Sequence, residues 1–174
     1  QCNAAVTLTP ATATDNCAVD TITNDAPAVF PVGSTTVTWT ATDVNGNTDT
    51  CTQTVTVNDT QDPIITCPAD VVVDADAGDC NAALTLTAAT ATDNCGVVSI
   101  TSDAPANFPV GSTTVTWTAT DAAGNTDTCT QIVTVSDTQD PVISCPSDVV
   151  VDAAAGQCNA AVTLTPATAT DNCA

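Results

Sequence analysis

The chain has 174 residues, no lysine, arginine or histidine, and a net charge of −20 that comes from aspartate side chains alone. This charge excludes nucleic acid and anionic membrane surfaces as partners, because the chain has no cation to replace the counterions around phosphate groups. It favours a cationic partner instead, and calcium, which binds carboxylate oxygen atoms, is the first candidate.

The predicted strands of the central part of the chain follow one another between turns rich in Gly, Pro, Asn and Asp. In TTVTWTATD the alternation places Val115, Trp117 and Ala119 on one face, so Trp117 is predicted to anchor a core and not to bind a ligand. No helix is predicted, and short strands at this spacing indicate an all-β sandwich. In chain order the predicted strands are IITC (64–67), DVVVD (70–74), AALTLT (82–87), VVSIT (97–101), TTVTWTATD (113–121) and TQIVTV (130–135).

The sequence repeats itself with a period of 78 residues. Cys2, Cys80 and Cys158 are 78 apart, and PVGSTTVTWTATD occurs unchanged at residues 31–43 and 109–121. Such repetition indicates a tandem array of like domains. We expect a partial domain without its first strand at residues 1–58, a complete domain at 59–136, and a partial domain holding only the first strands at 137–174. Because neither end falls on a domain boundary, we also expect a segment of a longer array.

One whole repeat resembles a known domain family. The run DTQDPIITCPADVVVDADAGDCNAALTLTAATATDNCG, continuing through FPVGSTTVTWTATDAAGNTDTC to VTV, is similar to the hyalin repeat (HYR) domain. The pieces ITCP, ATDNCG, FPVG and TATDAAGNT stand in the family's order and at its spacing. The resemblance covers residues 59–136 and the partial units on both sides.

The resemblance implies tandem immunoglobulin-like β-sandwiches in an extracellular adhesion or matrix protein without enzymatic activity. Four cysteines per repeat resemble the bacterial members, whereas the sea-urchin type tends to keep only those that match Cys67 and Cys129. The strict 78-residue regularity and the missing basic residues set this chain apart from the family.

Ten cysteines in this chain indicate disulfides and an oxidising, extracellular or cell-surface location. Without histidine or a C-x-x-C pair, structural zinc is disfavoured. In the implied sandwich the first and last strands are neighbours, so we expect a bond between Cys67 and Cys129. This bond also agrees with the two-cysteine relatives.

The remaining cysteines allow two readings. A strand rises about 3.3 Å per residue, which puts roughly 20 Å between Cys80 and Cys95, whereas a disulfide needs Cα atoms about 4.4 to 6.8 Å apart. One reading therefore joins neighbouring domains through Cys80–Cys173 and Cys2–Cys95. The other keeps a Cys80–Cys95 bond within one domain, permitted by a second strand that folds back.

The aspartates of the linkers suggest a metal. NDTQDP (58–63) and SDTQDP (136–141) resemble cadherin-type calcium linkers in placing acids just before a proline that opens a domain. Calcium takes six to eight oxygen ligands, which such a junction offers. The alternative is that Asp, Asn and Gly only form good turns. The predicted ligands are Asp59, Asp62, Asp93, Asn94, Asp121 and Asn125 at one junction, and Asp74, Asp76, Asp79, Asp137, Asp140 and Asp171 at the next.

A catalytic function is disfavoured, because no His, Lys, Arg, Tyr or Glu is present to activate or orient a reacting group. No apolar run is long enough for a membrane span.

We expect a structural extracellular protein, a segment of a tandem-repeat stalk or filament stiffened by disulfides and calcium. Its partners would be further copies of the repeat, head to tail, and neighbouring chains. The alternative is a cell-surface adhesion module whose loops bind a glycan or a protein.

Overall fold

The computed structural model describes residues 1–173. It consists of β-strands and loops, and among the described residues no helix is present, hence none that could cross a membrane. The prediction of all-β, immunoglobulin-like sandwich domains with a 78-residue repeat, stapled by disulfides, is confirmed.

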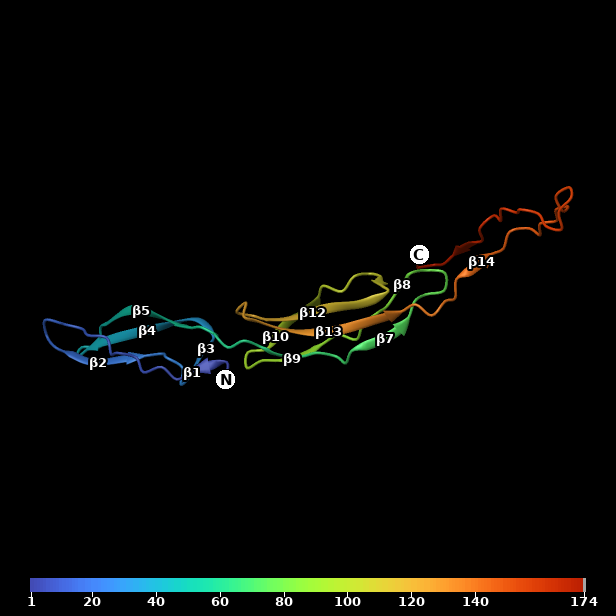
Figure 1. Ribbon diagram of the computed structural model, residues 1–174. Helices are drawn as coiled ribbons and strands as arrows, with labels where there is room; N and C mark the ends of the chain where they lie inside the picture. Colours follow the sequence, from blue (N-terminus) through green and yellow to red (C-terminus); the bar gives the residue numbers. More distant parts are fainter. Residues whose placement is uncertain (174) are drawn as a thin grey trace. The chain divides into compact units, whose positions relative to one another are not determined.

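The strands recur with the sequence period (Figure 1). The long strands β4 (Gly33–Asp43) and β12 (Gly111–Asp121) begin and end at residues 78 apart. The other strands below follow the same shift, except that β13 extends one residue further than β5, and β7 (Val71–Asp74) has no counterpart strand at 149–152 although the sequence there is the same. The related pairs are β1 (Asn3–Ala4) with β8 (Asn81–Ala82), β2 (Val19–Asn24) with β10 (Val97–Ser102), β3 (Phe30–Pro31) with β11 (Phe108–Pro109), β5 (Thr48–Val57) with β13 (Thr126–Ser136), β6 (Ile64–Thr66) with β14 (Val142–Ser144), and β9 (Thr90–Thr92) with β15 (Thr168–Thr170).

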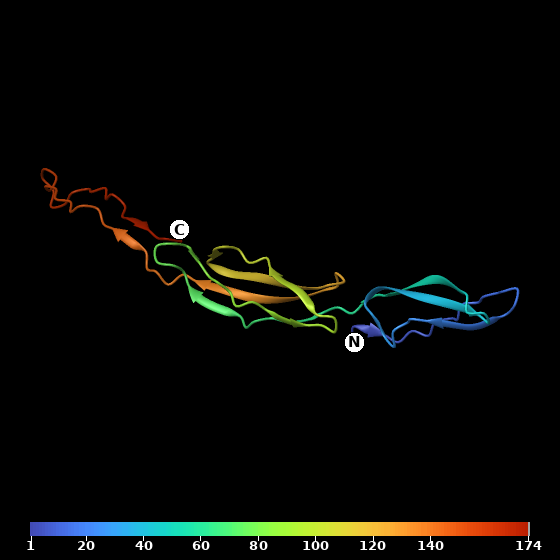
Figure 2. The same ribbon diagram turned by 180° about the vertical axis from the view of Figure 1, so that it is seen from behind.

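One compact unit contains Gln1–Cys67, Ala89–Thr101 and Trp117–Cys129. Its three-stranded sheet has the order β2-β4-β5, and these strands lie side by side in both views (Figures 1 and 2). The pairs β1-β3 and β6-β9 are antiparallel. The bonds Cys2–Cys95 and Cys67–Cys129 both lie within this unit.

The second unit contains Pro68–Ala88, Ser102–Thr116 and the described residues from Thr130 onward. Here β7 (Val71–Asp74) pairs in parallel with β13, while β8-β11 and β14-β15 are antiparallel. The Cys80–Cys173 bond lies within this unit. Strands β10, β12 and β13 each extend through both units and form a sheet with β7 in the order β10-β12-β13-β7.

Buried side chains occupy equivalent positions in the two copies. In the first repeat Phe30, Val37, Trp39 and Val55 form an apolar cluster. Their counterparts in the second repeat are also buried: Phe108, Val115, Trp117 and Val133. Trp117 is 6 % exposed, as predicted for a core anchor.

One predicted strand is wrong. Of the run AALTLT, only Ala82 belongs to a strand, and residues 83–87 have no ladder partner. Leu84 and Leu86 are half-buried while their neighbours are exposed, so the segment keeps the alternation of an extended chain. Alternation of polar and apolar residues indicates that one face of a segment is buried. A strand also needs a neighbouring segment whose backbone N–H and C=O groups are free to form hydrogen bonds.

Candidate functional site: the repeat junctions

The ATDNC loop forms the same turn in each copy. The Asp93 carboxylate accepts a hydrogen bond from the backbone N–H of Cys95 at 2.6 Å. Asp15 and Asp171 make the same bond to Cys17 and Cys173, at 2.7 and 2.9 Å. These bonds cap the turn, so this part of the motif agrees with the simple turn reading, but in Asp93 they use only one of the two carboxylate oxygen atoms.

The asparagine of the motif bonds beyond its own loop. Asn94 donates from Nδ2 to the carbonyl of Gln1 at 3.3 Å. Asn172 donates in the same way to the carbonyl of Asp79 at 2.8 Å. In both cases the acceptor is the residue just before a disulfide-bonded cysteine, so the amide and the disulfide hold the same pair of segments.

The disulfides follow the reading that joins neighbouring repeats. Cys2 is bonded to Cys95 and Cys80 to Cys173, each pair 93 residues apart, with Cα separations of 4.8 and 4.9 Å. Cys67 is bonded to Cys129 with a Cα separation of 5.8 Å. We call the two 93-residue bonds the staples. The Cys80–Cys95 alternative is absent from the structure.

The first staple lies beside an acidic group with unpaired oxygen atoms. Ligand atoms of Asp59, Asp93 and Cys95 lie within 4.8 Å of one another. Asp59 Oδ2, Asp93 Oδ1 and Asn94 Oδ1 are buried and accept no hydrogen bond. A buried, unpaired carboxylate oxygen is costly, and a cation would offset that cost. The Cys95 sulfur is already in a disulfide, so only the oxygen atoms could act as ligands for a hard cation.

The second staple has the equivalent group. Ligand atoms of Asp137, Asp171 and Cys173 lie within 4.8 Å of one another, and Asp137 is exposed. Gln139 also belongs here, although the sequence analysis did not select it. It donates to the carbonyl of Asp76 at 3.2 Å and accepts from the N–H of Gly78 at 3.1 Å. The signal that could have found it is the glutamine inside both DTQDP linkers.

Asp121 and Asn125 serve the turn that they enclose. Asp121 Oδ1 accepts from the N–H groups of Ala123 and Asn125, and Oδ2 accepts from Asn125 Nδ2 at 2.7 Å. Asn125 Nδ2 also donates to the carbonyls of Asp59 and Gln61. Asp121 is 4 % exposed, and both of its oxygen atoms are used. Its carboxylate therefore orders the turn and, through Asn125, the linker. It is not one of the carboxylates that have an unpaired oxygen atom.

The other predicted ligands are not members of these two acidic groups. Asp62 and Asp140 are exposed beside the linker prolines. Asp76 accepts from the N–H of Ala83, which closes the DADAGD turn. Asp79 contributes its backbone carbonyl to Asn172, and Asp74 ends β7. Their role as metal ligands stays a prediction.

The hydrogen-bonded turn aspartates make the free energy of unfolding depend on pH in the acid range. Burial raises the pKa of Asp121, but hydrogen bonds from Asn125, Gly124 and Ala123 outweigh it and hold the pKa below the usual 3.8. The Asn47 side chain does the same for Asp43. A lowered native pKa adds stability that is fully present above pH 3.8 and is lost as pH falls through the native pKa.

We therefore expect the stability difference between the native chain and Asp121→Asn to shrink below about pH 4, as chemical unfolding at several pH values would show. An unchanged difference down to pH 2 would contradict this.

Two stretches of the chain match the HYR domain family, residues 1–57 and 58–135. The chain is 38 % identical over 158 residues to hyalin of Lytechinus variegatus and 37 % identical over 150 residues to hyalin of Strongylocentrotus purpuratus. These alignments cover 87 % and 82 % of the chain, but only 30 % and 12 % of the two relatives. The chain thus spans less than a third of the length of either.

Among solved structures, the cadherin domains 1–4 of protocadherin gamma B7 resemble the chain with 13 % identity and a TM-score of 0.34. That likeness covers 75 % of this chain and 46 % of the other. A TM-score this low assigns neither fold nor function.

Proposed function

The chain belongs to the HYR domain family, and from that premise we propose that it is a segment of a long extracellular stalk or filament. HYR membership and three disulfides make it an extracellular or cell-surface protein. In the proposed array the domains are residues 1–58, 59–136 and 137–174, of the four-cysteine type found in bacteria. Its partners are further copies of the repeat, head to tail, and neighbouring chains.

The staples are the observation that carries this proposal. Each joins the cysteine just before β1 or β8 of one repeat to the ATDNC loop of the next, through residues 93 apart. A covalent bond in addition to the linker leaves two connections between neighbours, which restricts hinge motion at the junction. A protein whose task is length and stiffness requires that restriction, whereas loop-based adhesion does not. Binding of a glycan or a cell-surface protein stays a prediction.

We further propose that calcium binds at the junctions. The residues fit a hard cation, because ligand atoms of Asp59 and Asp93 lie within 4.8 Å of each other and each of these carboxylates has a buried oxygen without a hydrogen-bond partner. Asn94, the next residue after Asp93, also has a buried side-chain oxygen without a partner. Calcium prefers such carboxylate and carbonyl oxygen atoms. A bound ion would neutralise the negative charges of Asp59 and Asp93. It would also connect the linker 58–63 to the ATDNC loop.

Calcium is expected to raise the melting temperature, because a ligand that binds only the folded state stabilises it by about 2.7 kcal/mol at a concentration of about 100 Kd. Calorimetry in calcium and in chelator would measure this. Asp93→Asn should remove the part of the calcium response that comes from the acidic group beside the first staple. Asp15→Asn is the matched control, because Asp15 caps the same turn but no acidic group forms around it among the described residues. Equal melting temperatures with calcium and with chelator would contradict the proposal.

A further inference from the structure

The two staples share a charged environment. In each, one sulfur atom lies within 4.8 Å of oxygen atoms of two carboxylates, one from the linker and one from the ATDNC loop. Residues 1–173 contain no third group of this kind, so the bond between Cys67 and Cys129 has none. The groups are Asp59, Asp93 and Cys95 at the first staple, and Asp137, Asp171 and Cys173 at the second.

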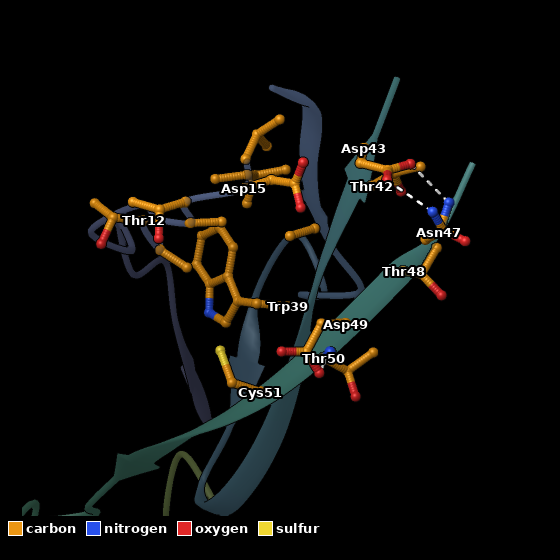
Figure 3. A pocket seen from close by; sticks show the side chains of 16 residues that line it. Thr12, Asp15, Trp39, Thr42, Asp43, Asn47, Thr48, Asp49, Thr50 and Cys51 are labelled. Atoms are coloured by element: carbon orange, nitrogen blue, oxygen red, sulfur yellow. Dashed lines mark hydrogen bonds between the residues drawn. The ribbon is translucent and has the colours of Figure 1, made fainter. Parts of the chain in front are cut away.

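The charge of the first group is not offset by other side chains. Asp59 Oδ2 and Asp93 Oδ1 are buried and accept no hydrogen bond. The chain has no lysine, arginine or histidine that could pair with them. Figure 3 shows the opposite case in Asp43, both of whose carboxylate oxygen atoms accept hydrogen bonds from Asn47. Because donors spread the charge of a carboxylate, the acids beside the staple keep more of theirs.

The carboxylate of the ATDNC loop is held beside the disulfide. Asp93 accepts the backbone N–H of Cys95 at 2.6 Å, and Asp171 accepts that of Cys173 at 2.9 Å. Each bond ties the carboxylate to the residue whose sulfur is in the staple. Asn94 Nδ2 also donates to the Cys95 sulfur at 3.4 Å, but sulfur is a weak acceptor and this contact carries no net charge.

Thiol–disulfide exchange places negative charge at this group by either route. A small thiolate attacks one sulfur of the Cys2–Cys95 bond and forms a new bond to it, and the other cysteine leaves as a thiolate with the electron pair. A second small thiolate then displaces the first as a small disulfide, so two small thiols are oxidised while the staple is reduced to two thiols. Attack on Cys95 brings the reagent to the carboxylates, and attack on Cys2 leaves the charge on Cys95.

Coulomb repulsion sets the size of the effect. Two like unit charges about 5 Å apart disfavour each other about fourfold even at the dielectric constant of water, and more at a lower one. A pair of carboxylates therefore slows an anionic reagent about tenfold at low ionic strength. In about 1 M salt the Debye length falls to about 3 Å, so most of this repulsion should disappear.

We propose that the acidic groups determine which thiols open the staples: they repel anionic thiols and leave the bonds reactive toward cationic ones. This selectivity belongs to the junction without calcium, because a bound ion would cancel the charge of the same acids. The staple is then the connection that remains between neighbouring repeats besides the linker, and the acids protect it from anionic reductants. The inference goes beyond the proposed function and does not depend on calcium binding.

The first test compares three small thiols that differ in charge: cysteamine, which is cationic, neutral 2-mercaptoethanol, and anionic 2-mercaptoethanesulfonate. The full chain, with its amino terminus acetylated to remove the positive charge next to Cys2, is treated in chelator at low salt. Alkylation at short times and peptide mapping give the initial rate of opening of each disulfide. For each thiol, the rate at Cys2–Cys95 is divided by the rate at Cys67–Cys129 in the same molecule, which cancels the intrinsic reactivity of the thiol.

This ratio of rates should be about tenfold lower for the sulfonate than for cysteamine, with 2-mercaptoethanol between them. The six bonded cysteines are all half-buried, so no bond is fully exposed to the reagent or fully hidden from it. In about 1 M salt the three ratios should approach one another. Equal ratios for the three thiols at low salt would overturn the proposal.

The second test uses Asp59→Asn, with Asp20→Asn as its matched control. Each variant removes one negative charge from the first repeat or its linker, but Asp20 is exposed on β2 and is not a member of an acidic group. Asp59→Asn should raise the sulfonate rate at Cys2–Cys95 about twofold to fourfold and leave Cys80–Cys173 unchanged. Asp20→Asn should change neither bond.

Equal gains in the two variants would show that the net charge of the chain, and not the local group, slows the reagent, and this would overturn the proposal. Both tests run in chelator, so the selectivity among thiols can fail while the calcium response and the staples remain.

Discussion

Replacing both Cys2 and Cys95 with serine is expected to lower the free energy of unfolding by about 2 to 4 kcal/mol. The bond joins residues 93 apart, and closing so long a loop removes much conformational freedom from the unfolded chain. Its loss also leaves the Asn94 amide bond to the Gln1 carbonyl as a local noncovalent tie between those segments. We expect a lower melting temperature and faster cleavage by protease at the linker 58–63.

The matched control is Cys17→Ser with Cys158→Ser. Cys17 is the counterpart of Cys95 one repeat earlier and Cys158 is the counterpart of Cys2 two repeats later, and both cysteines are exposed and free. The control adds the same two serines without opening a loop, so its stability should stay within about 0.5 kcal/mol of the native chain. If both double variants unfold alike, the staples do not stabilise the protein.

Phe108→Ala is expected to lower the free energy of unfolding by about 3 to 5 kcal/mol. Phe108 has no exposed surface, and with aromatic residues making up only 2 % of the chain, each ring fills a large share of a small core. Truncation removes the apolar transfer energy and leaves a cavity that the β8-β11 pair cannot close without breaking its register.

Val98→Ala is the control for this variant, because Val98 is 69 % exposed and its truncation should change stability by no more than about 0.5 kcal/mol. Denaturant unfolding followed by tryptophan fluorescence would measure both variants. A change below about 1 kcal/mol for Phe108→Ala would show that the core does not depend on this ring.

The sequence by itself determined the period, the long strands and the core positions. Alternation of small polar and apolar residues is a local property, so TTVTWTATD could be recognised as a strand with Trp117 inside it before any fold was known. The period of 78 then carried each assignment from one copy to the next. The same reasoning failed for AALTLT, because a strand is defined by a partner that local alternation does not reveal.

Only the tertiary structure decided which distant residues meet. The sequence left two pairings open for Cys80 and Cys95, because distance along one strand says nothing about the neighbouring repeat. It could not separate Asp121, whose two carboxylate oxygen atoms are both used in its turn, from Asp59 and Asp93, each of which keeps one buried oxygen atom unpaired.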